Sequence, residues 1–394
     1  MARKALIFSL SYYPHLVAGA EVAVKEITDR IGSDIEFDMV TLYAGKSRFE
    51  RIGNVNVYRV GLHIRISGSK IPHISYPIKF HYVASAFFKA LFLERKRHYD
   101  FTWSIMASFN GFSALFFKII HPKIPFLLTL QEGDSIEHIK RALGYMYPLY
   151  VKIFEKANYI QAISNFLADY GKKMGATCPS IVIPNGVDIN LFSEKPQQSQ
   201  IKALHYELGI DPFDTLLITT SRLVQKNAVG DIIESLTHLP QTSTGSVKLL
   251  ILGNGPLEEI LKKKTALLGL QNRVIFVGYV PHREMPLYLH SSQIFIRPSL
   301  SEGMGNSFIE AMASGLPVIA TAVGGIPDFL TDKKTGIFCE VENPRNIAQK
   351  IDELMKDKDL RDSIVKNARE MVSKKYDWTL VVESMKAVFS KISP

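Results

Sequence analysis

The sequence predicts an α/β protein of two domains, each a parallel sheet wrapped by helices. Three observations support this class. The chain has 394 residues, which is more than one ordinary core holds. Short apolar runs alternate with amphipathic segments through both halves, as in parallel strands joined by helices. Polar and glycine-containing loops follow these runs, at the sheet edge where such domains bind ligands.

The composition is that of a globular protein with a basic first half. Hydrophobic residues make up 46% and charged residues 22%. Cys178 and Cys339 lie far apart, so we expect neither a disulfide framework nor a zinc site. Of the net charge of +9, residues 1–190 carry +8, with 23 Lys/Arg against 15 Asp/Glu. Nucleic acid, an acidic surface or an anionic membrane would each suit that charge.

The first half reads as successive strand and helix units. We expect helices at residues 20–31 and 111–120, and strands at 4–10, 37–42, 55–60, 100–106, 125–130 and 158–162. The run 4–10 is taken as a strand and not a leader, because no small-residue cleavage site follows it. Ser164 is placed to cap the helix after the last of these strands. No apolar run approaches the ~18 residues of a membrane span.

Residues 64–97 combine basic and aromatic side chains. The aromatic ones include Tyr76, Phe80, Tyr82, Phe87, Phe88 and Phe92, and the basic ones are Arg65, Lys70, Lys79, Lys89, Arg95, Lys96 and Arg97. Such a segment can lie at a bilayer interface, with its cations among anionic headgroups. It can equally be a core helix with a solvated basic end, and both interpretations stay open.

The second half restarts after a polar segment, residues 193–200, which we interpret as the linker. Strands are expected at 215–220, 249–252, 274–277 and 293–297, and two charged helices from residue 346. Gly253-Asn-Gly255 opens like a dinucleotide fingerprint, but Glu258 stands where its third glycine would be.

The loop and helix from Pro298 to Gly315 are predicted to bind an anion. The backbone N–H groups around Gly305, Asn306 and Ser307 lie at a helix start, where the helix dipole favours a phosphate. Glu302 precedes this point and Glu310 lies inside the helix. Alternatively, Ser307-x-x-Glu310 is a capping box with a purely structural role.

The same stretch resembles a known family. Glu302-x7-Glu310, followed by Ala-Met-Ala-Ser-Gly-Leu-Pro-Val-Ile-Ala-Thr and Gly324-Gly325, is similar to the donor-site signature of the retaining GT-B glycosyltransferases of family 4, the group 1 type. The resemblance implies two Rossmann-like domains facing each other across a cleft. Residues 1–190 with the C-terminal helix 377–394 would bind the acceptor, and residues 195–376 the donor.

The resemblance also implies residue roles. Glu310 would bind the ribose of a nucleotide sugar, while Glu302 and the amides of Gly305, Asn306 and Ser307 would hold its sugar or phosphates. Arg222 and Lys226 would bind the diphosphate, at a spacing one residue shorter than in many relatives. The residues expected to be catalytic are therefore Glu302, Arg222 and Lys226. The remaining donor contacts expected are Gly19 near a phosphate, and Gly278 and Tyr279 near the base.

The first domain departs from the family pattern. Many relatives carry a histidine near the end of two strands, where this chain has Ile105-Met106 and Gln131. Gln131, Glu132 and Asp134 are then the candidates for sugar or acceptor contact. A solvated loop without function is the alternative.

The expected activity is retaining transfer of a hexose-type sugar from a UDP- or GDP-sugar to an acceptor hydroxyl. The acceptor would be lipid-linked or a saccharide, in glycolipid or cell-surface polysaccharide synthesis. No cofactor, metal or nucleic acid is expected. The protein would be cytoplasmic, or peripheral on the inner face of the membrane. The alternatives are a sugar-nucleotide epimerase of the same fold, or an inactive scaffold that binds membrane or nucleic acid.

Overall fold

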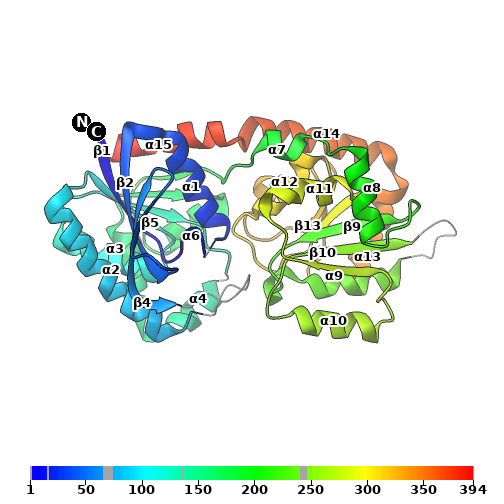
Figure 1. Ribbon diagram of the computed structural model, residues 1–394, viewed down its shortest axis with the longest axis horizontal. Helices are drawn as coiled ribbons and strands as arrows, with labels where there is room; N and C mark the ends of the chain where they lie inside the picture. Colours follow the sequence, from blue (N-terminus) through cyan, green and yellow to red (C-terminus); the bar gives the residue numbers. More distant parts are fainter. Residues whose placement is uncertain (1, 16, 65–73, 135, 240–245, 394) are drawn as a thin grey trace. The chain divides into compact units, whose positions relative to one another are not determined.

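The computed structural model describes residues 2–15, 17–64, 74–134, 136–239 and 246–393. The chain forms two compact units (Figure 1). Unit 1 runs to Gly186 and includes the chain from Trp378 onward, and unit 2 is Val187–Asp377.

Unit 1 is built on one twisted sheet. In spatial order its strands are β3 (Phe49–Ile52), β4 (Val55–Ile64), β2 (Ile35–Ala44), β1 (Arg3–Phe8), β5 (Phe101–Ile105), β6 (Phe126–Leu130), β7 (Tyr159–Ala162) and β8 (Ser180–Val182). Neighbours pair in parallel apart from β3 with β4. Residues 5–8 of β1 are wholly buried, as expected for a central strand covered on both faces.

Helices cover both faces of this sheet (Figure 1). They are α1 (Gly19–Ile31), α2 (Tyr76–Arg97), α3 (Phe109–Ile120), α4 (Ile136–Leu143), α5 (Tyr147–Lys156), α6 (Asn165–Lys173) and α15 (Trp378–Ile392). On one face, α1 and α15 share a core with alternate residues of β1, including Ala5 and Ile7. On the other, Phe8 meets Phe117 of α3. The Ser164 hydroxyl accepts from Leu167 N at 3.3 Å, which confirms the predicted cap of α6.

Unit 2 repeats the plan with a parallel sheet. Its strands, in spatial order, are β11 (Val274–Gly278), β10 (Val247–Leu252), β9 (Thr215–Thr220), β12 (Ile294–Arg297), β13 (Val318–Thr321) and β14 (Ile337–Cys339). Its helices are α7 (Ile189–Ser193), α8 (Gln198–Glu207), α9 (Val229–Ser235), α10 (Glu258–Leu267), α11 (Met285–His290), α12 (Asn306–Ser314), α13 (Pro344–Lys356) and α14 (Lys358–Lys375). Helices α9 and α13 share a core with one sheet face, and Phe308 of α12 packs on Phe295 of the other.

The structure corrects the position of the linker between the units. The predicted linker, residues 193–200, is wrong, because the chain enters unit 2 between Gly186 and Val187 and Gln198 already begins α8. In the segment 64–97, the part from Tyr76 onward is the helix α2, and Arg65 and Lys70 lie outside the described residues. In the part of the chain that the structure describes, every helix is too short or too polar to cross a membrane.

Candidate functional site

The polar loops of unit 2 gather at one sheet edge because its strands are parallel. The loops after β9 and β12 lie at the carboxyl ends of neighbouring strands. A backbone hydrogen bond from Leu300 N to Lys226 O, 2.7 Å, ties these two loops together. The predicted cations and the predicted acid loop therefore share one edge.

Arg297, the last residue of β12, organises this edge. Its buried guanidinium donates to the Ser307 hydroxyl at 2.8 Å, to Asn227 Oδ1 at 3.0 Å and to Glu302 Oε2 at 2.5 Å. It also lies over the Phe308 ring, 5.3 Å from its centroid. One side chain thus links the end of β12, both loops and the start of α12. The sequence offered one signal for it, a cation closing an otherwise apolar strand.

Glu302 is held in place on both oxygens and on its backbone. Besides the Arg297 bond, Oε1 accepts from Gly303 N at 3.2 Å. The Glu302 carbonyl accepts from Gly325 N at 3.1 Å, and a Cβ at Gly324 would come within 1.8 Å of it. Gly324, at φ +56°, therefore allows a close backbone approach that another residue would block.

Helix α12 begins at Asn306, after Gly305 with φ +86°. A Cβ at Gly305 would come within 2.6 Å of the Phe308 ring. No side chain caps this N-terminus, so the capping-box interpretation of Ser307 and Glu310 is wrong. The Ser307 hydroxyl instead accepts from Arg297. Gly315, at φ +84°, ends the helix as predicted.

Glu310 has a partner that sequence reasoning missed. Its Oε1 lies 3.0 Å from His282 Nε2, and the His282 ring packs edge-on against Phe192 at 5.2 Å. His282 follows Gly278 and Tyr279 in the chain. Gly278 ends β11 at φ +83°, and the Tyr279 ring is exposed.

Arg222 and Lys226 lie on the loop after β9. Arg222 is exposed and Lys226 is half-buried. The Asn227 side chain fixes their loop by donating to Arg222 O at 2.6 Å, while its oxygen accepts from Arg297. Asn227 therefore couples the cation loop to the Glu302 loop, although the sequence did not single it out.

The unit 1 candidates lie at the corresponding edge of the first sheet. Glu132, just beyond β6, accepts from Ala107 N through Oε1 at 2.6 Å. Burial raises the pKa of this carboxyl to about 7. Gln131 accepts from the Asn185 side chain at 3.2 Å, and Asp134 is exposed.

Gly19 is the first residue of α1. The turn before it is closed by Glu21, which accepts from Ser11 Oγ at 2.5 Å and from Ala18 N at 2.7 Å. Glu21 therefore has a structural role at this helix start.

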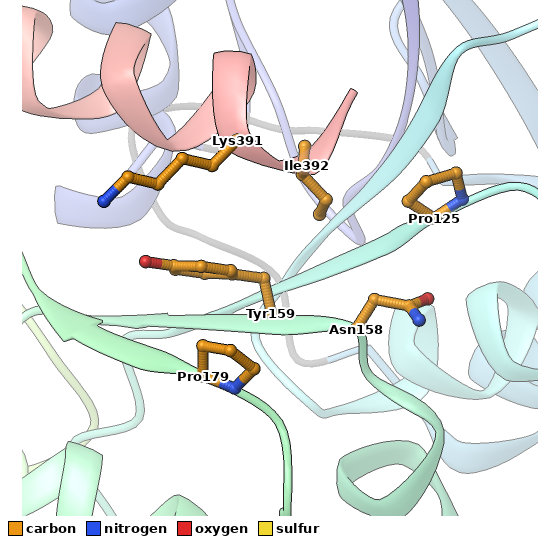
Figure 2. Close-up of a pocket in the computed structure, with 6 residues that line it drawn as sticks. All are labelled: Pro125, Asn158, Tyr159, Pro179, Lys391 and Ile392. Atoms are coloured by element: carbon orange, nitrogen blue, oxygen red, sulfur yellow. The ribbon is translucent and has the colours of Figure 1, made fainter. Parts of the chain in front are cut away.

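A hollow of about 490 Å³ lies at the opposite edge of the unit 1 sheet, at the amino ends of the strands (Figure 2). Figure 2 shows the Tyr159 ring between α15 and Pro179. Asn158, which also lines the hollow, accepts from Phe126 N at 2.9 Å. None of the predicted site residues lines it.

Part of the chain matches a known protein family. The family model for glycosyl transferases group 1 matches residues 200–371. An uncharacterized glycosyltransferase of Methanocaldococcus jannaschii is 24% identical over 409 residues, covering 98% of this chain and 97% of that protein. A GDP-mannose-dependent alpha-(1-6)-phosphatidylinositol monomannoside mannosyltransferase of Mycobacterium tuberculosis is 30% identical over 203 residues, covering 50% and 52%.

Solved structures share the fold. Anabaena HepE in complex with UDP and glucose superposes with a TM-score of 0.79 at 20% identity, covering 99% of this chain and all of that one. Sucrose-phosphate synthase of Thermosynechococcus elongatus superposes with a TM-score of 0.82 at 19% identity, covering 99% of each chain. The fold is GT-B, as predicted. Residues 200–371 match the model of the group 1 glycosyltransferases, the family expected from the Glu302 to Glu310 stretch.

Proposed function

We propose that the protein transfers a hexose-type sugar from a nucleoside diphosphate sugar to an acceptor hydroxyl, with retention of configuration and without a metal. The observation that carries this proposal is the unit 2 edge, where Arg297 braces Glu302 beside the start of α12 and the cation loop. HepE, solved with UDP and glucose, and the GDP-mannose-dependent relative support a UDP- or GDP-sugar donor.

The charges of the unit 2 edge suit a diphosphate. Arg222, Lys226 and the N–H groups at the start of α12 would offset its negative charge. As the bond from the anomeric carbon to the diphosphate breaks, the electron pair leaves with the diphosphate. Fixed positive charge stabilises that leaving group and so lowers the barrier.

The acids of the unit 2 edge suit hydroxyl groups. Glu302, held by Arg297, would accept from the donor sugar. Glu310, oriented by His282, would accept from the ribose. Gly278 and Tyr279 would lie beside the base. On the unit 1 edge, Gln131, Glu132 and Asp134 would meet a saccharide or lipid-linked acceptor, and Gly19 a donor phosphate.

The test is incubation of the protein with a panel of nucleotide sugars, with and without a total lipid extract. Release of nucleoside diphosphate that depends on acceptor supports transfer. Conversion of the donor sugar without acceptor would instead indicate an epimerase. Neither reaction with any donor would leave the scaffold alternative and contradict the proposal.

We also propose that unit 1 associates peripherally with an anionic membrane, on its cytoplasmic face, through α2. One face of α2 is buried against the sheet, through Tyr82, Ala86 and Leu93 among others. The opposite face carries an exposed ridge at four-residue spacing: Tyr76, Phe80, Ala84, Phe88 and Phe92.

Cations flank this α2 ridge. Lys89 lies 5.2 Å and Lys96 4.4 Å from the centroid of the Phe92 ring. Ile119 and Ile120, at the end of the neighbouring α3, are also exposed. A helix face that meets only water does not need an apolar ridge. A bilayer interface, in contrast, accepts the aromatic rings and pairs the cations with phosphate headgroups.

A further inference from the structure

Glu132 differs from the buried acids of the described chain in the pairing of its carboxylate oxygens. Glu21, Asp38 and Glu302 each have both carboxylate oxygens hydrogen-bonded. Glu132 Oε1 accepts from Ala107 N, but the buried Oε2 has no partner among the described residues. An unpartnered buried carboxylate oxygen is costly, so its presence calls for a function.

The place of Glu132 in the fold suits contact with a ligand. It follows β6 at the carboxyl edge of the unit 1 sheet, beside the end of β5, where Met106 N donates to Thr129 O at 2.8 Å. Met106 has φ +70°, an uncommon conformation for a non-glycine residue, immediately before the amide that holds Glu132. Glu132 as a whole is partly exposed, although its Oε2 is buried.

The surroundings of Glu132 favour exchange of a proton. The hydroxyls of Tyr150 on α5 and Tyr170 on α6, both buried, bond to each other at 2.9 Å near this carboxyl. Among the described residues, the charged group that acts on Glu132 is Asp134, a like charge. Burial and then this like charge raise its pKa, so neutral solution holds both protonation states.

We propose that Glu132 is the group that takes the proton of the acceptor hydroxyl during transfer. This inference rests on the proposed function. A hydroxyl suits Oε2 in either state, because it donates to the ionised oxygen and accepts from the protonated one. The acceptor oxygen bonds to the anomeric carbon, the bond from that carbon to the diphosphate breaks with its electron pair leaving on the diphosphate, and the proton passes to Oε2.

The neighbouring polar residues suit this role less well. Gln131 carries no titratable proton, and its oxygen already accepts from Asn185. Asp134 is exposed, so water competes with a ligand for its carboxylate. We therefore assign the proton to Glu132 and leave hydroxyl contacts to the other two.

The test is Glu132→Gln, with Glu137→Gln as the matched control on an exposed residue of α4. Glutamine keeps the oxygen that accepts from Ala107 N, so the loop should persist. We expect kcat for acceptor-dependent transfer to fall by about 10²–10⁴-fold. The wild-type rate should rise with pH around a midpoint near the Glu132 pKa of about 7, and the residual activity of the variant should lack that limb. Binding of the nucleoside diphosphate, measured by calorimetry, should not change.

Three results would overturn the assignment. The first is a kcat for transfer by Glu132→Gln within about threefold of the wild-type value. The second is persistence of the acid limb of the pH profile in that variant. Either result would contradict the role of Glu132 and leave the proposed glycosyltransferase activity standing. Absence of transfer by the wild type would overturn the proposed function and this inference together. If Glu132→Gln fails to fold, Glu132→Asp replaces it: a fall in kcat with the acid limb retained is expected, and an unchanged kcat contradicts the role.

Discussion

Each unit has an acid beyond a parallel strand at the carboxyl edge of its sheet, and the two acids have different hydrogen-bond partners. Glu302 follows β12 in unit 2, and Glu132 follows β6 in unit 1. Both are at carboxyl edges of parallel sheets. Glu302 is bonded to the buried Arg297 guanidinium, whereas Glu132 accepts from the backbone N–H of Ala107 and faces the like charge of Asp134.

The two carboxyl groups are suited to different chemical roles because their partners differ. A carboxylate paired with a buried guanidinium is held in one geometry, which suits binding of hydroxyls at a site already in place. A buried carboxyl without a cation can change its protonation near neutral pH. The contrast supports the two proposals, donor binding at the unit 2 edge and proton transfer at the unit 1 edge.

The comparison is broken most directly by removing the donor contacts proposed at the unit 2 edge. Lys226→Ala and Glu310→Ala should each lower kcat for transfer by about 10²–10³-fold, because each removes a fixed contact to the donor. Lys263→Ala, an exposed residue of α10, is the control. Acceptor-dependent release of nucleoside diphosphate is the measurement. Full activity in either variant would remove the donor-site assignment.

Removing the partner of Glu302 tests the pairing directly. Arg297→Met should lower the free energy of unfolding by about 3–5 kcal/mol, since it leaves a buried carboxylate without its cation. The double variant Arg297→Met/Glu302→Leu should recover part of this loss. Urea unfolding measures both, with the exposed Arg283→Met as control. An unchanged stability in Arg297→Met would mean that Glu302 does not depend on Arg297.

For Glu132, in contrast to Glu302, ionisation of the carboxyl is expected to destabilise the folded protein. Its pKa is raised from 4.5 to about 7 in the folded protein, so between these values the folded state binds a proton that the unfolded state has lost. Stability should therefore fall as pH rises through this window, by up to about 3 kcal/mol. Glu132→Gln should remove that fall and be the more stable form above pH ~7. Unfolding curves at several pH values test this, and a wild-type stability that rises through the window would contradict it.

The α2 ridge can be tested on vesicles. Replacing Phe88 and Phe92, 66% and 50% exposed, by serine should weaken binding to phosphatidylglycerol vesicles by more than about tenfold. Leu267→Ser is the control, because that residue is 87% exposed at the end of α10 in unit 2. Cosedimentation is the measurement. Two results would contradict the role of α2. One is equal binding by the Phe88/Phe92 variant and the Leu267→Ser control, and the other is binding of the wild type to neutral phosphatidylcholine as strong as to phosphatidylglycerol.

The smallest expected effect is that of a chelator. Positive side chains and amides are proposed to do the work that Mg²⁺ does in other transferases. Excess EDTA should therefore leave the transfer rate unchanged. A loss of activity that Mg²⁺ or Mn²⁺ restores would show that the unit 2 edge is incomplete without a metal.

Much of the fold was predictable because its signals are local. The buried runs that form β1, β6 and β10 are continuous and apolar, as parallel strands covered on both faces must be. The short strands β3 and β14 were not predicted. Strand β3 lies at an exposed edge with alternating burial, and β14 has only three residues, so neither leaves a strong pattern. The linker was misplaced because a polar stretch also suits a helix start.

The sequence by itself determined the alternation of strands and helices, the glycines that close turns, and the order of the loops that carry Arg222, Lys226 and Glu302. These follow from spacing and composition along the chain. Only the tertiary structure decided that Arg297 bonds Glu302, Asn227 and Ser307, that His282 meets Glu310, and that Glu132 keeps an oxygen without a partner. The reason is physical: pairing, burial and proton affinity depend on which side chains the packed sheets bring within a few ångströms, and that distance is not written in the order of residues.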